Sequence, residues 1–155
     1  MDLCPQLRRL AEEHARWLEL GRRREGEGAA EQAARLLAGW EDEMVPHCRA
    51  EEEVLLPELA RHLSETDAVV VFTHGDHLVL RRLARELRLA KEPARPAALG
   101  SLLVKLEEHF RFEEQTLFPA LQQAIGCDCL AQLGEEIASM QGRPGTRPGL
   151  RRRAR

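Results

Sequence analysis

One phrase of the sequence occurs twice: His47-Cys-Arg-Ala-Glu-Glu-Glu-Val-Leu-Leu-Pro-Glu-Leu59 returns 62 residues later as His109-Phe-Arg-Phe-Glu-Glu-Gln-Thr-Leu-Phe-Pro-Ala-Leu121. Seven positions are identical, and they include the His, the Glu four residues after it and the Pro ten residues after it. On an α-helix, residues four apart lie on one face. The repeat therefore predicts a duplicated helix pair in which two equivalent helices each present an imidazole and a carboxylate.

Length and composition favour a single helical domain. The chain has 155 residues, with 4% aromatic residues and no tyrosine, and leucine, alanine, glutamate and arginine, which favour helix, are abundant. We therefore expect an all-α protein. No stretch approaches the ~20 apolar residues of a membrane span, and the first residues lack the order of a signal peptide. The expected protein is soluble and cytoplasmic, with no membrane partner.

Apolar residues recur at helical spacing in four long segments, which run from about residue 2 to 21, 29 to 62, 67 to 90 and 97 to 124. The prediction is an up-down four-helix bundle, followed by a short fifth C-terminal helix, Cys127 to Met140, that packs outside the bundle. Residues 1–141 form the expected domain. Pro46 and Pro57 lie inside the second segment and each removes a backbone hydrogen bond, so we expect that helix to be kinked or interrupted.

The last fourteen residues, 142–155, carry six arginines and no acidic residue. A Gly/Pro/Arg sequence with one leucine cannot bury enough apolar surface to fold, so a disordered basic tail is expected. Apart from this tail the chain carries no strong signal for nucleic acid. An unknown acidic protein partner is an alternative use of the same charge, and a solvated tail without a partner is the favoured interpretation.

The four cysteines are Cys4, Cys48, Cys127 and Cys129. Their spacing matches neither a structural zinc site nor the disulfide framework of a secreted domain. The Cys127-Asp-Cys129 spacing is compatible with a redox pair or a soft-metal clip, but no second pair completes four ligands. We therefore expect reduced thiols and assign them no function.

The apolar seam of the predicted helices is interrupted by polar residues at one level. Burying imidazoles and carboxylates without partners costs several kcal/mol per group, and metal cations are natural partners for both. This mixed set suits iron, manganese or zinc and exceeds what one tetrahedral zinc requires, so two metals fit better than one. The predicted metal ligands are His14, His47, Glu51, His74, His77, His109 and Glu113.

Several of these residues have ordinary explanations when they are taken singly. A lone His on an apolar seam, such as His14, is more often a hydrogen-bonded core residue than a ligand. Glu52, Glu53 and Glu114 are expected to be solvated or to orient the ligand imidazoles, and His62 is expected at the surface. The joint placement of the histidines on four helices, in a duplicated pattern, favours the metal site, with Glu51 and Glu113 as bridges between the two ions.

These residues carry a resemblance to the hemerythrin-like, or HHE cation-binding, family. It covers about Leu3 to Ala124, through His14, the repeated phrase and the acid-His pair Asp76-His77. The resemblance implies a four-helix bundle that holds a non-haem di-iron centre with two bridging carboxylates, terminal histidines and an open position for O₂, NO or peroxide. The chain departs from the family in the third helix, where His-x3-His is replaced by Thr73 followed by His74-Gly-Asp-His77. His77 is therefore the safer match, and His74 decides between five histidines and four.

The first functional hypothesis is a non-enzymatic di-iron protein that reversibly binds O₂, NO or peroxide for sensing, storage or carriage. One alternative is a di-iron enzyme of the peroxidase, NO-handling or iron-sulfur repair type. Another is an interaction module in which a zinc or manganese ion only stabilises the fold and the basic tail binds a partner. No catalytic residue is predicted.

Overall fold

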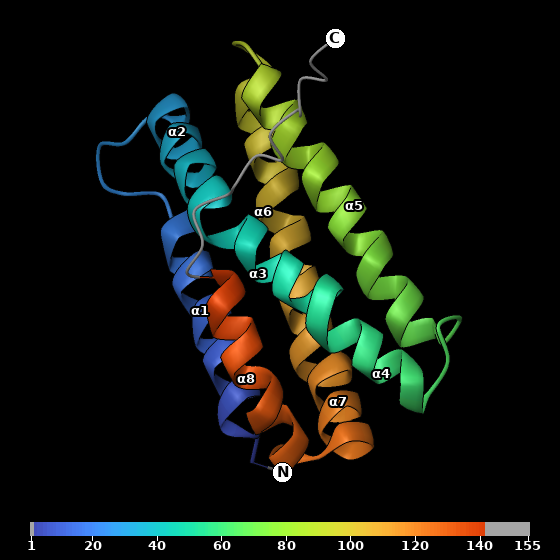
Figure 1. Ribbon diagram of the computed structural model, residues 1–155. Coiled ribbons are helices and arrows are strands. Elements are labelled where there is room, and N and C mark those ends of the chain that lie inside the picture. The colour runs from blue at the N-terminus through green and yellow to red at the C-terminus, as the bar shows by residue number, and fades with distance from the viewer. Residues whose placement is uncertain (1, 142–155) are drawn as a thin grey trace, which may run out of the picture.

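The computed structural model describes residues 2–141, and every regular element in that range is helical (Figure 1). The prediction of an all-α fold is confirmed. The elements are α1 (Pro5–Gly21), α2 (Ala29–Gly39), η1 (Trp40–Met44), α3 (Val45–Ala50), η2 (Glu51–Leu55), α4 (Leu56–His62), α5 (Ala68–Leu89), α6 (Arg95–Phe112), η3 (Glu113–Leu117), α7 (Phe118–Ile125) and α8 (Cys127–Gln141), where η marks a π-helical turn. The predicted tail lies outside the described residues, and its separation from a 1–141 domain stays a prediction.

The helices alternate in direction along the bundle. In Figure 1, α1 rises from the N-terminus, the run from α2 to α4 descends diagonally, α5 rises and the run from α6 to α7 descends. The up-down bundle is therefore confirmed. The fifth helix, α8, folds back against α1 and α3 and buries Leu130 and Ile137. None of the helices in residues 2–141 combines the length and the apolar character that crossing a membrane requires.

Prolines inside the long helices coincide with π-helical turns. The turns η1, η2 and η3 each end two residues before a proline, namely Pro46, Pro57 and Pro119. In η1, for example, the N–H of Val45 bonds the carbonyl of Trp40, five residues back. A proline has no N–H, and its ring collides with the carbonyl four residues earlier, so a wider turn before it relieves the conflict. The helical path continues through each proline, and the predicted interruption takes the form of a π turn.

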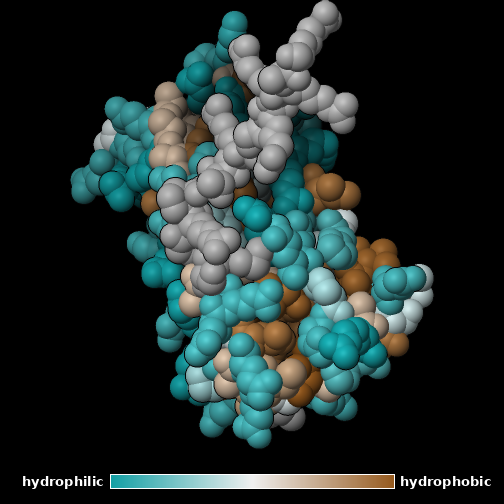
Figure 2. All heavy atoms as spheres, viewed as in Figure 1, coloured by the Kyte–Doolittle hydropathy of each residue, from teal (hydrophilic) through white to brown (hydrophobic). Residues whose placement is uncertain are grey.

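The apolar core consists of two clusters, one on each side of a polar layer. Along α1 the order is Leu10, His14 and Trp17, and the first and last of these belong to different clusters. Figure 2 shows a mostly hydrophilic face outside this interior. The cluster near the N-terminus includes Leu7, Leu10, Leu55, Leu59, Leu117, Phe118 and Leu130, and the cluster at the other end includes Trp17, Leu36, Trp40, Met44, Leu80, Leu102 and Phe110.

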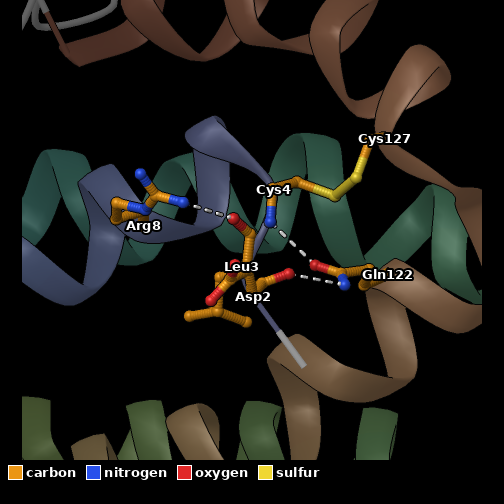
Figure 3. The surroundings of a disulfide bond; sticks show 6 residues. All are labelled: Asp2, Leu3, Cys4, Arg8, Gln122 and Cys127. Atoms are coloured by element: carbon orange, nitrogen blue, oxygen red, sulfur yellow. Dashed lines mark hydrogen bonds between the residues drawn. A yellow bond between two sulfur atoms is a disulfide. The ribbon is translucent and has the colours of Figure 1, made fainter.

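A disulfide joins Cys4 to Cys127 and ties the start of α1 to the start of α8 (Figure 3). The two Cα atoms are 5.4 Å apart although 123 residues separate them in sequence. Beside the bond, the Gln122 side chain accepts a hydrogen bond from the N–H of Cys4 and donates one to the carbonyl of Asp2. The prediction of reduced thiols was wrong for this pair, because sequence spacing does not reveal which residues meet in space. Cys48 and Cys129 are free.

We expect Cys4→Ser to lower the free energy of unfolding by about 2–4 kcal/mol, because it releases a constraint on the unfolded chain. Cys129→Ser, which removes a free thiol from the same region, is the matched control and should change it by less than about 0.5 kcal/mol. Urea denaturation without reductant measures both effects. Equal stabilities of the two variants would show that the bond does not constrain the fold in solution.

Candidate metal centre

Six buried residues meet in the polar layer, and each is at most 2% exposed. They come from all four long helical runs, and the two glutamates are the first residues of the π turns η2 and η3. The layer therefore places two carboxylates among four imidazoles inside an apolar core. Its members are His14, His47, Glu51, His77, His109 and Glu113.

These six residues form two groups that share both carboxylates. In each group the candidate ligand atoms lie within 4.8 Å of one another, a spacing that suits a single metal ion. Because Glu51 and Glu113 belong to both groups, the two sites are adjacent. We call the group His14, His47, Glu51 and Glu113 site A, and the group Glu51, His77, His109 and Glu113 site B.

Each shared carboxylate turns one oxygen toward each site. Oε1 of Glu51 lies 3.4 Å from Nε2 of His47 in site A, and its Oε2 lies 3.2 Å from Nε2 of His77 in site B. Oε2 of Glu113 lies 3.1 Å from Nε2 of His14, and its Oε1 lies 3.0 Å from Nε2 of His109. This is the orientation that a bridging carboxylate needs, because its two oxygens face different ions.

A second carboxylate lies beside the outer nitrogen of each imidazole. The Nδ1–H groups of three histidines donate hydrogen bonds of 2.8 to 3.0 Å to carboxylates on other helices, and the fourth pair is 3.5 Å apart without hydrogen-bond geometry. With Nδ1 engaged, Nε2 is left to face the interior as a ligand atom. The pairs are His14 with Glu114, His47 with Glu13, His77 with Glu52, and His109 with Asp76.

The outer carboxylates of site B carry cations of their own. Arg81 lies 2.8 Å from Glu52, and Lys105 lies 2.7 Å from Asp76. Burial raises the pKa of Glu52, but His77 and Arg81 lower it to about 2. Burial likewise opposes ionisation of Asp76, and His109 and Lys105 lower its pKa below the ordinary value. Both outer carboxylates of site B are therefore held in the charged form.

Most of the inner atoms of the cluster lack hydrogen-bond partners although they are buried, the exceptions being Nε2 of His14 and Nε2 of His47, which lie 3.1 Å apart and bond to each other. Both oxygens of Glu51 and of Glu113 are unsatisfied in this way, as are Nε2 of His77 and Nε2 of His109. Leaving such groups unpaired in a core is costly. A pair of first-row metal ions would satisfy them, because imidazole nitrogen and carboxylate oxygen are ligands that these ions accept. The residues present therefore fit a metal centre.

In the metal-free protein, protons on the imidazoles balance the carboxylates. Burial lowers the pKa of His14, but Glu113 and Glu114 more than offset this effect and raise the pKa to about 9. The pKa of His109 is raised in the same way by Glu113 and Asp76. Burial opposes ionisation of Glu113, but the surrounding histidines hold its pKa well below the ordinary value. A bound cation would replace these protons.

The structure places His74 outside the cluster. Its side chain is exposed, whereas Thr73 is fully buried and its hydroxyl donates to the carbonyl of Val69 at 2.9 Å. The assignment of His74 to the polar layer is therefore corrected, and four histidines remain. Both residues lie within one turn of His77, so helical spacing alone could not distinguish them.

Sequence reasoning missed Glu13. A signal was present, because Glu13-His14 on the first helix and Asp76-His77 on the third are both acid-His pairs. Glu52 and Glu114 were expected either to be solvated or to orient ligand imidazoles. The second expectation is confirmed, because Glu52 accepts a hydrogen bond from His77 and Glu114 accepts one from His14. Glu53 instead pairs with Arg49 at the surface, and the exposed His62 pairs with Glu58.

The comparison with protein families agrees with the geometry. The family model described as the hemerythrin HHE cation binding domain matches residues 2–121, which include all six residues of the cluster. No curated protein and no solved structure matches the chain significantly. The resemblance carried by the repeated phrase is thus confirmed, and the cluster coincides with the cation-binding domain.

The metal-free protein should lose stability as the pH rises through about 9. Since the folded pKa of His14 lies above its ordinary value of 6.5, its protonation stabilises the fold fully below pH 6.5, and this contribution disappears as the pH passes about 9. Urea denaturation of the chelator-treated protein over this range measures the effect. His14→Gln should reduce the pH dependence, whereas the control His62→Gln, at an exposed position, should retain it; the same curve for all three proteins would contradict the assignment.

Proposed function

Because the chain belongs to the hemerythrin HHE cation-binding family, we propose that it holds two iron ions at sites A and B and reversibly binds O₂, or a related small ligand such as NO or peroxide. The role of such binding would be sensing, storage or carriage. The supporting observation is that the two oxygens of Glu51, and likewise those of Glu113, face different pairs of imidazoles.

The chain supplies an incomplete set of ligands to each site. Two imidazoles and two shared carboxylates give four protein donors per site, fewer than the six of an octahedral ion. This leaves room for a small exogenous ligand. When bound, two Fe(II) ions supply electrons to a ligand such as O₂, and the protein's part is to position them and to control access.

Buried aromatic rings cover the His14 side of site A. The His14 ring stacks on those of Phe110 and Phe118, with centroid distances of 4.1 Å and 5.5 Å. Both phenylalanines are at most 2% exposed, and apolar clusters close the polar layer above and below. Apolar surroundings of this kind strengthen the electrostatic attraction between the ligands and a cation, and they shield a bound small molecule from solvent. The outer carboxylates meanwhile orient the imidazoles of His14, His47 and His77 through hydrogen bonds to Nδ1.

We expect about two irons per chain in protein purified anaerobically from iron-replete cells. Glu51→Gln and Glu113→Gln should each reduce the ratio below one and lower the melting temperature, because each removes a bridging charge from between buried imidazoles. Glu53→Gln is the matched control, since this glutamate is exposed on the same helical run. Elemental analysis measures the ratio. One zinc per chain, or two irons retained in both bridge variants, would contradict the proposed centre.

The iron-loaded protein should bind about one O₂ or NO per pair of irons and release it when the gas is removed. Optical titration under controlled gas pressure measures both the stoichiometry and the reversibility. Rapid turnover of added peroxide would instead favour the enzyme hypothesis. Absence of any gas-dependent spectral change with two irons bound would leave a metal-binding protein without this ligand chemistry and would overturn the carrier or sensor proposal.

A further inference from the structure

A pocket of about 480 Å³ lies beside site A, between α1 and the segment formed by η1 and α3. The six residues of the cluster are almost fully buried, so a cation has to pass between helices to reach them. Glu13, Trp17, Pro46 and His47 are among the residues that line this pocket. Because His47 is also a member of site A, one imidazole belongs to both the pocket and the cluster.

Glu13 and His47 connect the pocket to site A. The Nδ1–H of His47 donates to Oε2 of Glu13 at 3.0 Å, while Nε2 of the same ring lies 3.4 Å from Oε1 of Glu51. The Glu13 side chain is 12% exposed and lines the pocket. A carboxylate that a solvated cation can approach is therefore separated from site A by a single side chain.

Acidic residues gather at the pocket. Asp42 and Glu43, both exposed on η1, line it together with Glu13, while Arg9 and Arg16 line it from α1. Arg9 lies 3.5 Å from the Glu13 carboxylate. Three acids against two bases leave an excess of negative charge, and a cleft with such an excess raises the local concentration of cations and their rate of association.

The outer carboxylates of site B are neutralised by cations and offer less attraction to an approaching ion. Arg81 covers Glu52, and Lys105 covers Asp76, so both outer carboxylates of this site are capped by a positive side chain. Two further pockets of the described residues, of about 360 and 420 Å³, are lined by no member of the cluster. Site A therefore lies beside a pocket with an acidic mouth formed by Asp42 and Glu43, whereas these two further pockets do not reach site B.

The pocket wall is also a weak point of the helix. Pro46 lies in this wall, in the first turn of α3 and two residues after the end of the π turn η1. Because proline has no N–H, the wall has one backbone hydrogen bond fewer than a regular helix would have. Segments with fewer such bonds open locally at lower cost. A brief opening here would widen the path from the pocket to His47.

We propose that this pocket is the portal through which divalent cations reach the buried cluster. Asp42 and Glu43 collect the cation at the mouth, and Glu13 delivers it to His47 and site A, from which the shared carboxylates lead to site B. The inference rests on the proposed function, since it requires a cluster that binds metal. The inference adds a route for cation entry. A change in this route should alter the rate at which cations reach the cluster and leave the final number of bound cations per chain unchanged.

The test compares two double charge reversals in the metal-free full-length protein. Asp42→Lys/Glu43→Lys places cations at the mouth, and Glu135→Lys/Glu136→Lys makes the same change in net charge on the exposed face of α8. Co(II) is the probe, and its absorption in stopped-flow mixing at low salt gives the rate of uptake. Elemental analysis gives the final ratio. We expect uptake about tenfold slower in the first variant, near the wild-type rate in the second, and two ions per chain in all three.

Added salt separates a charge effect from a damaged fold. It should slow uptake by the wild-type protein and reduce its advantage over the mouth variant, because screening removes the attraction. Equal rates for the two double variants would overturn the portal. So would a wild-type rate of uptake in the mouth variant. Failure of the wild-type protein to bind Co(II) at all would remove the proposed function and the portal with it.

Discussion

Two carboxylates buried without hydrogen bonds are the constraint on which the rest of the structure depends. Glu51 and Glu113 are fully buried, and none of their four oxygens has a hydrogen-bond partner. An ionised carboxylate is tolerated in an apolar core only if positive charge surrounds it. The convergence of four imidazoles on these oxygens meets that need, by carrying protons in the metal-free protein and by ligating cations when metal is present.

The four helical runs are interlocked by this layer. Each run contributes at least one inner ligand and, beside it in sequence, a carboxylate that lies against an imidazole on another run, in three of the four cases with a hydrogen bond. No helix can therefore rotate about its axis without disturbing a histidine on a neighbour. The layer sets the register of the bundle, whereas the apolar clusters above and below supply most of the burial. The outer carboxylates that lie against these imidazoles are Glu13, Glu52, Asp76 and Glu114.

Much of this arrangement follows from sequence patterns, because the repeated phrase and the helical spacing both refer to one helix at a time. Spacing identifies Glu51 and Glu113, but Thr73 and His74 both lie within one turn of His77, and packing between helices decides which one is buried. The bond between Cys4 and Cys127 depends on where two helix starts meet in space. Prolines indicate a disturbed helix, yet they do not say that the disturbance is a π turn.

The inner ligands of the two sites are alike, and their surroundings differ. Each site has two histidines and shares the same two glutamates, as the duplication of the phrase suggests. Around site B, Arg81 and Lys105 neutralise the outer carboxylates, whereas Glu114 beside site A is 43% exposed and Glu13 faces a pocket. Burial of the ligands protects the cluster from water but also blocks its filling. Arg81 and Lys105 neutralise the surroundings of site B, whereas site A lies beside an acidic pocket. The proposed route through that pocket would let the cluster fill with cations although its ligands are buried.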